Sequence, residues 1–206
     1  MRPSPIFYLL ASLSYTYTYA YAHDYISTSD SDSDSASAAA STHPTVYFIR
    51  HGEKPDDPDD SGLNADGFKR AQCLRDVFGP HSRYHIGYIM APKVSRRGKH
   101  RRSYETVLPL ARDLGLDVDT SCKSTQVRCA ARKVRAYKGS GNILIAWRHS
   151  QMREILRKLG DSKAPAYPEE RFDLIWDVPY PYQNITGMRS EECPELDSGV
   201  ELRVQV

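Results

Sequence analysis

Two arginine–histidine pairs, Arg50-His51 and Arg148-His149, are the residues of this sequence best suited to chemistry. A guanidinium group recognises phosphate through two parallel hydrogen bonds. A neutral imidazole can act as a nucleophile or carry a proton. Gly52, directly after the first pair, lets the backbone turn sharply and approach a bound group closely. The combination predicts phosphoryl-transfer chemistry, which depends mainly on positioning and positive charge.

Each pair follows a short apolar segment, VYFI at 46–49 and NILIAW at 142–147. Short runs rich in β-branched and aromatic residues are typical of buried strands. Ligands of open α/β sheets bind just beyond the carboxyl ends of the strands. We therefore expect both histidines to lie at one edge of one sheet and to face each other across a pocket.

Helical and strand patterns alternate along the rest of the chain, which indicates an α/β sheet with helices on both faces. The clearest helix is predicted over residues 63–78, with Asn64 as its N-cap. Its apolar face should comprise Phe68, Ala71, Leu74 and Phe78. Further helices are predicted over 102–114, 127–137 and 151–159, and further strands over 84–90, near 118, and over 172–178, 185–188 and 200–206.

Four stretches between residues 46 and 159 together resemble the histidine phosphatase superfamily, which has the phosphoglycerate mutase-like fold. They are FIRHGE, then LNADGFKRA, then Arg102 four residues before Thr106, and finally NILIAWRHSQ. The segments FIRHGEKP, SYETVLPLA, FDLIW and SEECPELD further resemble a small fungal-type subgroup. The resemblance implies a three-layer α/β/α architecture with a mostly parallel central sheet.

The resemblance also implies roles for individual residues. His51 corresponds to the nucleophile that becomes phosphohistidine, and His149 to the second histidine at the transferring phosphoryl group. Arg50 and Arg102 correspond to the phosphate-binding arginines, with Arg101 as the adjacent rival of Arg102. The family needs no metal and no cofactor. The expected activity is hydrolysis of a phosphate monoester through a phosphohistidine on His51.

Three departures from the family pattern leave other functions open. Arg148 before His149 is atypical, and it could add a phosphate contact or point to solvent. Ser150 stands where the family usually has glycine, and its hydroxyl could narrow the pocket or donate to a substrate. The family's general acid has no clear equivalent. Glu53 and Asp57 are candidates through nearness in sequence, and Asp119 is a weaker one. The alternatives are a pseudoenzyme that binds a phosphorylated ligand without turnover and, less favoured, a phosphomutase.

The formal net charge of the 206-residue chain is only +2, so its composition does not indicate a general polyanion binder. The basic run 96–102 lacks the interleaved aromatic residues of a single-strand nucleic-acid site. A rim that attracts a small phosphorylated substrate is the better interpretation. No nucleic-acid partner is expected, and the sequence leaves the oligomeric state open.

The N-terminal region divides into two segments before a domain expected over 43–206. Residues 1–22 resemble a signal peptide, with Arg2, an apolar stretch and a small-x-small sequence at 20–22. That apolar stretch is too short to span a membrane. Residues 23–42 form a linker rich in Ser, Asp and Ala that is expected to be disordered. Secretion is the prediction, with a cytoplasmic location as the alternative.

Four cysteines show no zinc-site spacing, so no metal site is expected. In a secreted protein they would form disulfides. Cys122 with Cys129 would close a short loop, but the pairing stays open. Asn184-Ile185-Thr186 is an acceptor sequence for N-glycosylation in that setting.

Overall fold

A computed structural model describes residues 43–197 of the chain. The predicted signal peptide (1–22), the predicted linker (23–42) and the candidate strand at 200–206 lie outside the described residues and stay predictions. The domain expected over 43–206 is therefore seen from residue 43 to residue 197.

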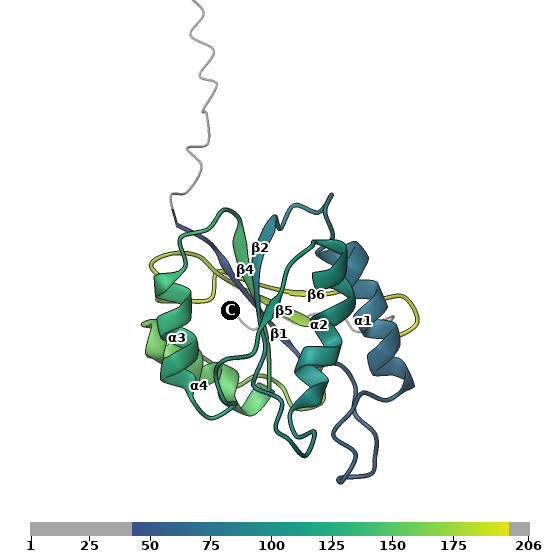
Figure 1. The fold of residues 1–206 in the computed structure, drawn as a ribbon. Coiled ribbons are helices and arrows are strands. Elements are labelled where there is room, and N and C mark those ends of the chain that lie inside the picture. Colours follow the sequence, from purple (N-terminus) through teal and green to yellow (C-terminus); the bar gives the residue numbers. More distant parts are fainter. Residues whose placement is uncertain (1–42, 198–206) are drawn as a thin grey trace, which may run out of the picture. The chain divides into compact units, whose positions relative to one another are not determined.

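The described chain forms a six-stranded sheet with the strand order β3-β2-β4-β1-β5-β6 (Figure 1). The pairs β1–β4, β2–β4 and β2–β3 are parallel, whereas β1–β5 and β5–β6 are antiparallel. The prediction of a mostly parallel sheet is confirmed. The strands are β1 (Val46–Arg50), β2 (Ile86–Met90), β3 (Val118–Asp119), β4 (Asn142–Trp147), β5 (Leu174–Val178) and β6 (Gly187–Ser190).

Helices cover both faces of the sheet and complete the three layers (Figure 1). One pair, α1 (Ala65–Val77) and α2 (Arg101–Asp113), packs on one face, and the other pair, α3 (Val127–Ala136) and α4 (His149–Leu159), packs on the opposite face. Asn64 caps α1 as predicted, because its side chain accepts a 2.9 Å hydrogen bond from the backbone N–H of Gly67. Among the described residues, no helix is long and apolar enough to cross a membrane.

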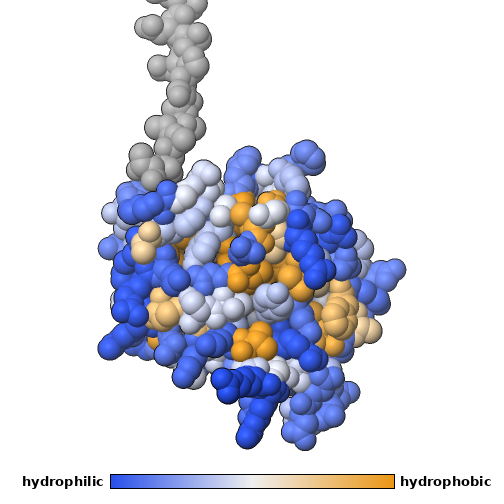
Figure 2. Space-filling view, in the orientation of Figure 1, coloured by the Kyte–Doolittle hydropathy of each residue, from blue (hydrophilic) through white to orange (hydrophobic). Residues whose placement is uncertain are grey.

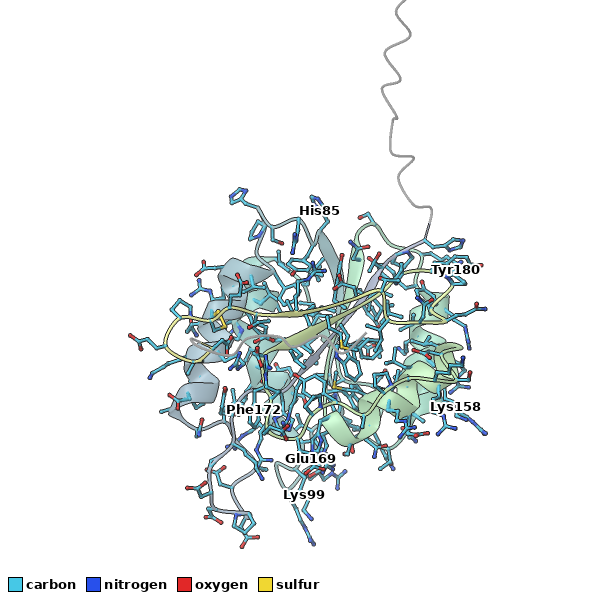
Figure 3. All side chains as sticks on the ribbon, turned by 180° about the vertical axis from the view of Figure 1, so that it is seen from behind. His85, Lys99, Lys158, Glu169, Phe172 and Tyr180 are labelled. Carbon is cyan, nitrogen blue, oxygen red and sulfur yellow. A yellow bond between two sulfur atoms is a disulfide. The ribbon has the colours of Figure 1, made fainter. Side chains whose placement is uncertain are left out.

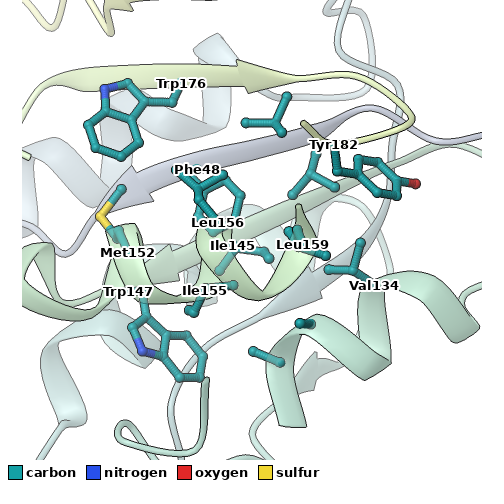
Figure 4. Packing of buried hydrophobic residues seen from close by; sticks show 14 of the residues in the cluster. Phe48, Val134, Ile145, Trp147, Met152, Ile155, Leu156, Leu159, Trp176 and Tyr182 are labelled. Carbon is teal, nitrogen blue, oxygen red and sulfur yellow. The ribbon is translucent and has the colours of Figure 1, made fainter. Parts of the chain in front are cut away.

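Alternation along the central strands divides the core into two clusters. In β1, Phe48 faces the α3–α4 side while Ile49 faces the α1–α2 side. In β4, Ile145 and Leu144 separate in the same way, because successive side chains of a strand point to opposite faces. Figure 4 shows the α3–α4 cluster, in which Trp147 and Trp176 belong to the buried set around α4. Both faces of the sheet are therefore buried, and its binding positions lie at the strand ends.

Two predictions from the sequence are wrong, namely the burial of Phe68 and the bounds of the strand after β5. Phe68 is 51% exposed, whereas it was expected on the buried face of α1. The buried residues of α1 are Gly67, Arg70, Ala71 and Leu74, because a glycine and a buried ion-pairing arginine set the contact face. The strand expected at 185–188 lies instead at Gly187–Ser190, where it pairs with β5.

All four cysteines are paired in two disulfides. Cys122 is paired with Cys129, which closes a short loop and decides a pairing that the sequence left open. Cys73–Cys193 joins α1 to the segment after β6, across a sequence separation of 120 residues. A cross-link over such a long loop constrains the unfolded chain more than a short one does.

Candidate active site

Strand pairing brings the two arginine–histidine pairs to one edge of the sheet. β1 and β4 are parallel neighbours, and Arg50 pairs in register with Trp147. The backbone N–H of His51 donates to the Trp147 carbonyl at 3.1 Å, directly before the second pair. Figure 3 shows Lys99, Glu169 and Phe172 together at one end of the domain, opposite the end that carries His85 and Tyr180.

The ring of His51 is held in one orientation. The residue is only 5% exposed, and its Nδ1 lies 2.8 Å from the carbonyl oxygen of Gly52. A carbonyl can only accept, so a neutral ring in this contact carries its proton on Nδ1. The lone pair then resides on Nε2, which is the atom available for nucleophilic attack.

The surroundings keep this imidazole neutral. Burial lowers the pKa of His51 to about 3, and the charges of Arg50, Arg102 and His149 push in the same direction. The hydrogen bond to the Gly52 carbonyl opposes this shift without overcoming it. A protonated ring could not attack phosphorus, so the site holds His51 in its reactive form well below neutral pH.

Gly52 is required by a close crossing of β1 over α1. A side chain at Gly52 would put its Cβ 3.0 Å from the Cα of Gly67. A Cβ on Gly67 would in turn lie 2.5 Å from the carbonyl oxygen of Glu53. The N–H of Gly52 donates to Thr106 Oγ1 at 2.8 Å, and that hydroxyl donates to the Arg102 carbonyl at 2.8 Å. The glycines and the threonine of the sequence motifs therefore fix the turn that carries His51.

Arg50 is a buried cation whose hydrogen-bond partners are carbonyl groups. It is 4% exposed, and its Nη1 donates to the carbonyls of Arg171, at 2.7 Å, and of Glu169. Its guanidinium carbon lies 3.8 Å from the ring centroid of Phe172, a cation–π contact. Its Nε is buried and has no hydrogen-bond partner in the described structure.

Arg102 is held in a similar way. Its Nε donates to the carbonyl of Gly62 at 2.9 Å, and its Nη2 donates to the carbonyl of Asp60. It lines the same pocket as His51. The rival Arg101 instead pairs with Glu105 at 2.8 Å on the outer side of α2. The geometry therefore favours Arg102 over Arg101 as the arginine beside His51.

The arginines of the site differ from others of the domain in having no carboxylate partner. Among residues 43–197, neither Arg50 nor Arg102 has an ion pair within 4.0 Å, although more distant carboxylates act on both. Arg70, the other buried arginine, binds Glu53, Glu191 and Asp197 at 2.6, 2.7 and 2.8 Å. Buried charges are normally paired, so the positive charge around His51 calls for an anion from outside the chain.

A pocket of about 240 Å³ opens beside His51. Its walls carry three permanent cations and one carboxylate. Figure 2 shows strongly hydrophilic side chains over the lower end of the domain, where the loops after β1 and β2 project in Figure 1. The lining residues are His51, Pro58, Asp59, Ser61, Lys99, His100, Arg102, Ser103 and Arg148.

His149 and Ser150 lie in the first turn of α4, beside this pocket but not among its lining residues. His149 is half-buried, and its side chain forms no hydrogen bond within the described part of the chain. Burial and the charge of Arg50 lower the pKa of His149, which favours a neutral ring. His149 is near enough to act on the charge of His51, whereas Ser150 is exposed.

The proposed acid Glu53 is occupied elsewhere. Arg70 donates to both of its carboxylate oxygens, through Nε at 3.0 and 3.1 Å and through Nη2 at 2.6 Å. This contact links Glu53 to the buried cluster of Glu191 and Asp197. Glu53 does not line the pocket, so its expected role as a proton donor at His51 needs correction. A structural carboxylate, paired with a buried arginine, fits the contacts better.

The other two carboxylate candidates are also displaced from the pocket lining. Asp57 accepts from the backbone N–H of Asp59 at 2.9 Å within its own loop. Asp119 pairs with Lys133 at 2.9 Å and accepts from Tyr88. The carboxylate that does line the pocket is Asp59. Asp59 lies in the acidic loop 56–60, two residues after the sequence candidate Asp57.

His100 and Arg148 also line the pocket. The sequence predicted no role for His100 and left Arg148 open between a phosphate contact and a position in solvent. His100 precedes α2 with a φ of 69°, a left-handed conformation, and Arg148 precedes α4. Both are N-cap residues, and neither side chain caps its helix. Two helix N-termini without side-chain caps therefore lie at the pocket, where the helix dipoles favour an anion. In the sequence, the basic run 96–102 was the signal for His100, and the pair Arg148-His149 was the signal for Arg148.

One group of acidic and sulfur side chains, Glu191, Cys193 and Asp197, has the spacing of a metal site in the described residues. Cys193 is bound in a disulfide, and both carboxylates bind Arg70. A thiolate ligand is therefore missing, and a guanidinium already supplies the positive charge. These residues do not fit a metal ion.

No protein-family model and no curated protein sequence matches this chain. Solved structures do match it in three dimensions. One is a proposed phosphohistidine phosphatase SixA from Agrobacterium tumefaciens, with a TM-score of 0.51 and 18% identity over 71% of this chain and 97% of that one. Another is the protein histidine phosphatase SixA complexed with tungstate, with a TM-score of 0.52 and 14% identity over the same shares. At these identities the likeness concerns the fold: the chain folds like the SixA phosphatases.

Proposed function

We propose that this protein is a phosphate monoester hydrolase of the histidine phosphatase superfamily, acting through a phosphohistidine on His51. The order of its motifs and its SixA-like fold support the family. The buried, neutral and oriented imidazole of His51 supports the nucleophile. Membership of a fungal-type subgroup, and a mechanism without metal, belong to the same proposal.

The reaction has two steps. Nε2 of His51 attacks phosphorus, and a P–N bond forms as the P–O bond to the leaving group breaks. Water then attacks phosphorus, the P–N bond breaks, and His51 returns to its neutral form. Arg50, Arg102 and His149 stabilise the equatorial oxygens, because the charge of the transition state spreads over them.

The observation that carries this proposal is the unpaired positive charge beside His51. Arg50 and Arg102 are fixed by backbone carbonyls, which orient a guanidinium without neutralising it. The partnerless Nε of Arg50 is a buried donor, and leaving such a donor unsatisfied costs about 1–3 kcal/mol. A phosphate oxygen would satisfy it. Tungstate, the oxyanion bound by a SixA of the same fold, is a suitable stand-in for phosphate.

Asp59 is the side chain best placed to serve the leaving group. It is the carboxylate that lines the pocket with His51, whereas Glu53 is bound to Arg70. As a carboxylic acid it would protonate the departing oxygen, and as a carboxylate it would then take a proton from the attacking water. This assignment replaces Glu53 in the proposed mechanism.

A pseudoenzyme that binds a phosphorylated ligand is the second candidate. It is favoured by Ser150, which occupies the position of the family's usual glycine, and by the loss of Glu53 as an acid. A phosphomutase would have to retain the substrate between transfers. No contact of the site supports that function specifically, so it ranks third.

The test is hydrolysis of p-nitrophenyl phosphate by the parent protein and by His51→Ala. We expect turnover in the parent, a loss of at least about 10³-fold in the variant, and an acid-labile phosphoprotein in the parent alone. Tungstate should inhibit, and EDTA should not. Equal background rates combined with tungstate binding would favour the pseudoenzyme. Phosphate transfer between positions of one sugar acid would favour the mutase.

A further inference from the structure

The pocket beside His51 contains more positive charge than one phosphoryl group needs. In the proposed function, Arg50 and Arg102 neutralise the phosphoryl group. Lys99 and Arg148 line the pocket as well, together with the imidazole of His100. Among the described residues, neither Lys99 nor Arg148 forms an ion pair or a side-chain hydrogen bond. Asp59 is the one carboxylate of the lining, and it opposes only part of this charge.

Arg148 is close to the other positive groups of the pocket. Its charge acts on both His100 and Arg102, and it lowers the pKa of His100 after the larger effect of burial. Like charges crowded into one pocket repel each other, which is unfavourable unless an anion binds between them. The exposed side chain of Arg148 has no other partner to satisfy in the described part of the chain.

His100 is anchored to the core rather than free at the surface. Its Nε2 lies 3.4 Å from the hydroxyl of Ser124, a residue that is 3% exposed. The Ser124 carbonyl accepts a 3.0 Å hydrogen bond from the indole of Trp147, the last residue of β4. The part of the pocket wall that His100 forms is thus connected to the central sheet, as a preorganised binding surface requires.

The size of the pocket restricts what can bind. A volume of about 240 Å³ lies below the range of about 300–1,000 Å³ that is usual for drug-sized ligands. A phosphoryl group at His51 therefore leaves enclosed space for only a short part of the leaving group. That part would lie among Lys99, His100 and Arg148.

We propose that this pocket selects phosphate esters whose short leaving group carries a second anionic group, bound by Arg148, Lys99 and His100. The inference rests on the proposed function for the position of the first phosphoryl group. The second group is a carboxylate or another phosphate, since both offer the oxygen acceptors that guanidinium and ammonium groups bind. Within this interpretation, Asp59 stands at the bridging oxygen between the two anions.

Binding of phosphonates tests the inference without requiring turnover. The probes are propylphosphonate, 3-phosphonopropanoate and propane-1,3-bisphosphonate, measured by calorimetry at constant ionic strength. We expect both two-anion probes to bind the parent protein at least about tenfold more tightly than propylphosphonate, which corresponds to about 1.4 kcal/mol. The two probes together show whether carboxylate or phosphate is the preferred second group.

In the Arg148→Ala variant, most of the tenfold preference for the two-anion probes over propylphosphonate should be lost. The affinity of this variant for propylphosphonate should differ from that of the parent protein by less than about threefold. Lys99→Ala should act in the same direction with a smaller effect. Arg153→Ala is the matched control, because it removes the same charge from an exposed position of α4 outside the pocket. Equal affinities for the three probes, or an equal loss in Arg148→Ala and Arg153→Ala, would overturn the inference.

The two proposals fail in different ways. Absence of p-nitrophenyl phosphate hydrolysis would count against catalysis, whatever the phosphonates do. Loss of the two-anion preference in an active enzyme would count against the second-anion subsite alone.

Discussion

At the residue scale, the central property of this protein is that His51, the proposed nucleophile, is buried, oriented and uncharged. The 2.8 Å contact between Nδ1 and the Gly52 carbonyl oxygen indicates that the neutral ring carries its proton on Nδ1. Burial lowers the pKa of His51, so that Nε2 stays unprotonated. Nearby positive charges contribute to the same result. Between pH values of about 3 and 6.5, His51 therefore stays neutral, whereas an ordinary histidine with a pKa near 6.5 would be largely protonated.

The first prediction concerns the titration of His51. Because its pKa is lowered to about 3, its ring resonances should not shift between pH 5 and pH 8 in the absence of phosphate. The measurement is a two-dimensional NMR titration, with His51→Gln used to assign the signal. A midpoint near 6.5 for that signal would contradict the burial described for the ring.

The second prediction separates Asp59 from the other acids of its loop. Asp59→Asn should lower kcat/KM for an alkyl phosphate by about 10²–10⁴-fold, the usual contribution of a general acid. It should lower kcat/KM for p-nitrophenyl phosphate far less, since that leaving group needs little protonation. Asp57→Asn is the control, because Asp57 does not line the pocket. Equal losses for both substrates would show that Asp59 does not donate the proton.

At the element scale, the site depends on how closely β1 crosses α1. The turn after β1 and the first turn of α1 are in contact through backbone atoms at Gly52 and Gly67. The same turn is held from α2 by the hydroxyl of Thr106. Parallel pairing of β1 with β4 then supplies the second histidine from the start of α4. Five elements, β1, α1, α2, β4 and α4, must therefore pack correctly before the site exists.

The third prediction tests this crossing with Gly67→Ala. Alanine usually stabilises a helix relative to glycine, by about 1 kcal/mol. Here the Cβ of the alanine would lie 2.5 Å from the Glu53 carbonyl oxygen. We therefore expect the substitution to destabilise the protein, lowering the free energy of unfolding by about 1–3 kcal/mol. Chemical denaturation measures the effect. Phe68→Ala, next to it and half exposed, should change the free energy of unfolding by no more than about 0.5 kcal/mol.

At the scale of the whole molecule, the segment after β6 supports the site from a distance. Cys193 ties this segment to Cys73 of α1, and its carboxylates reach the guanidinium of Arg70. Arg70 also holds Glu53, two residues beyond His51. Burial would lower the pKa of Arg70, but its carboxylate partners outweigh burial and raise it. One buried cation thus joins the segment after β6 to the turn that carries His51.

The fourth prediction follows from Glu191 in that cluster. Burial raises its pKa from 4.5 to about 8, against the opposing effect of Arg70. The folded protein then binds more protons than the unfolded chain between these values, so this group's contribution to stability falls as the pH rises toward about 8. In the Glu191→Gln variant, the melting temperature should fall less between pH 6.5 and pH 8 than it does in the parent protein.

Differential scanning calorimetry at several pH values makes this comparison. Glu154→Gln is the control, because Glu154 pairs with Arg157 at the surface of α4. It should leave the pH dependence of the parent unchanged. A Glu191→Gln protein whose stability follows pH as steeply as the parent over this window would refute the assignment.

The sequence by itself determined the order of strands and helices, the Asn64 cap and the arrival of both arginine–histidine pairs at one sheet edge. These features follow from contacts between near neighbours in the chain, and from the rule that parallel strands present their carboxyl ends together. The family motifs added the roles expected of His51, Arg50 and Arg102. Phe68 was misplaced because a helical pattern alone does not say which residues a buried ion pair needs.

Only the tertiary structure decided which charges meet. From its position in the sequence, Glu53 was a candidate acid beside His51. In the structure it binds Arg70, together with Glu191 and Asp197, which lie 121 and 127 residues after Arg70 in the chain. His100, Arg148 and Asp59 share a pocket although they come from three separate segments. Such contacts leave no periodic or local signal, because they arise from the packing of whole elements. Charge compensation across the fold, rather than nearness in sequence, distinguishes Arg50 and Arg102, which are proposed to bind an anion, from Arg70, which is paired with carboxylates.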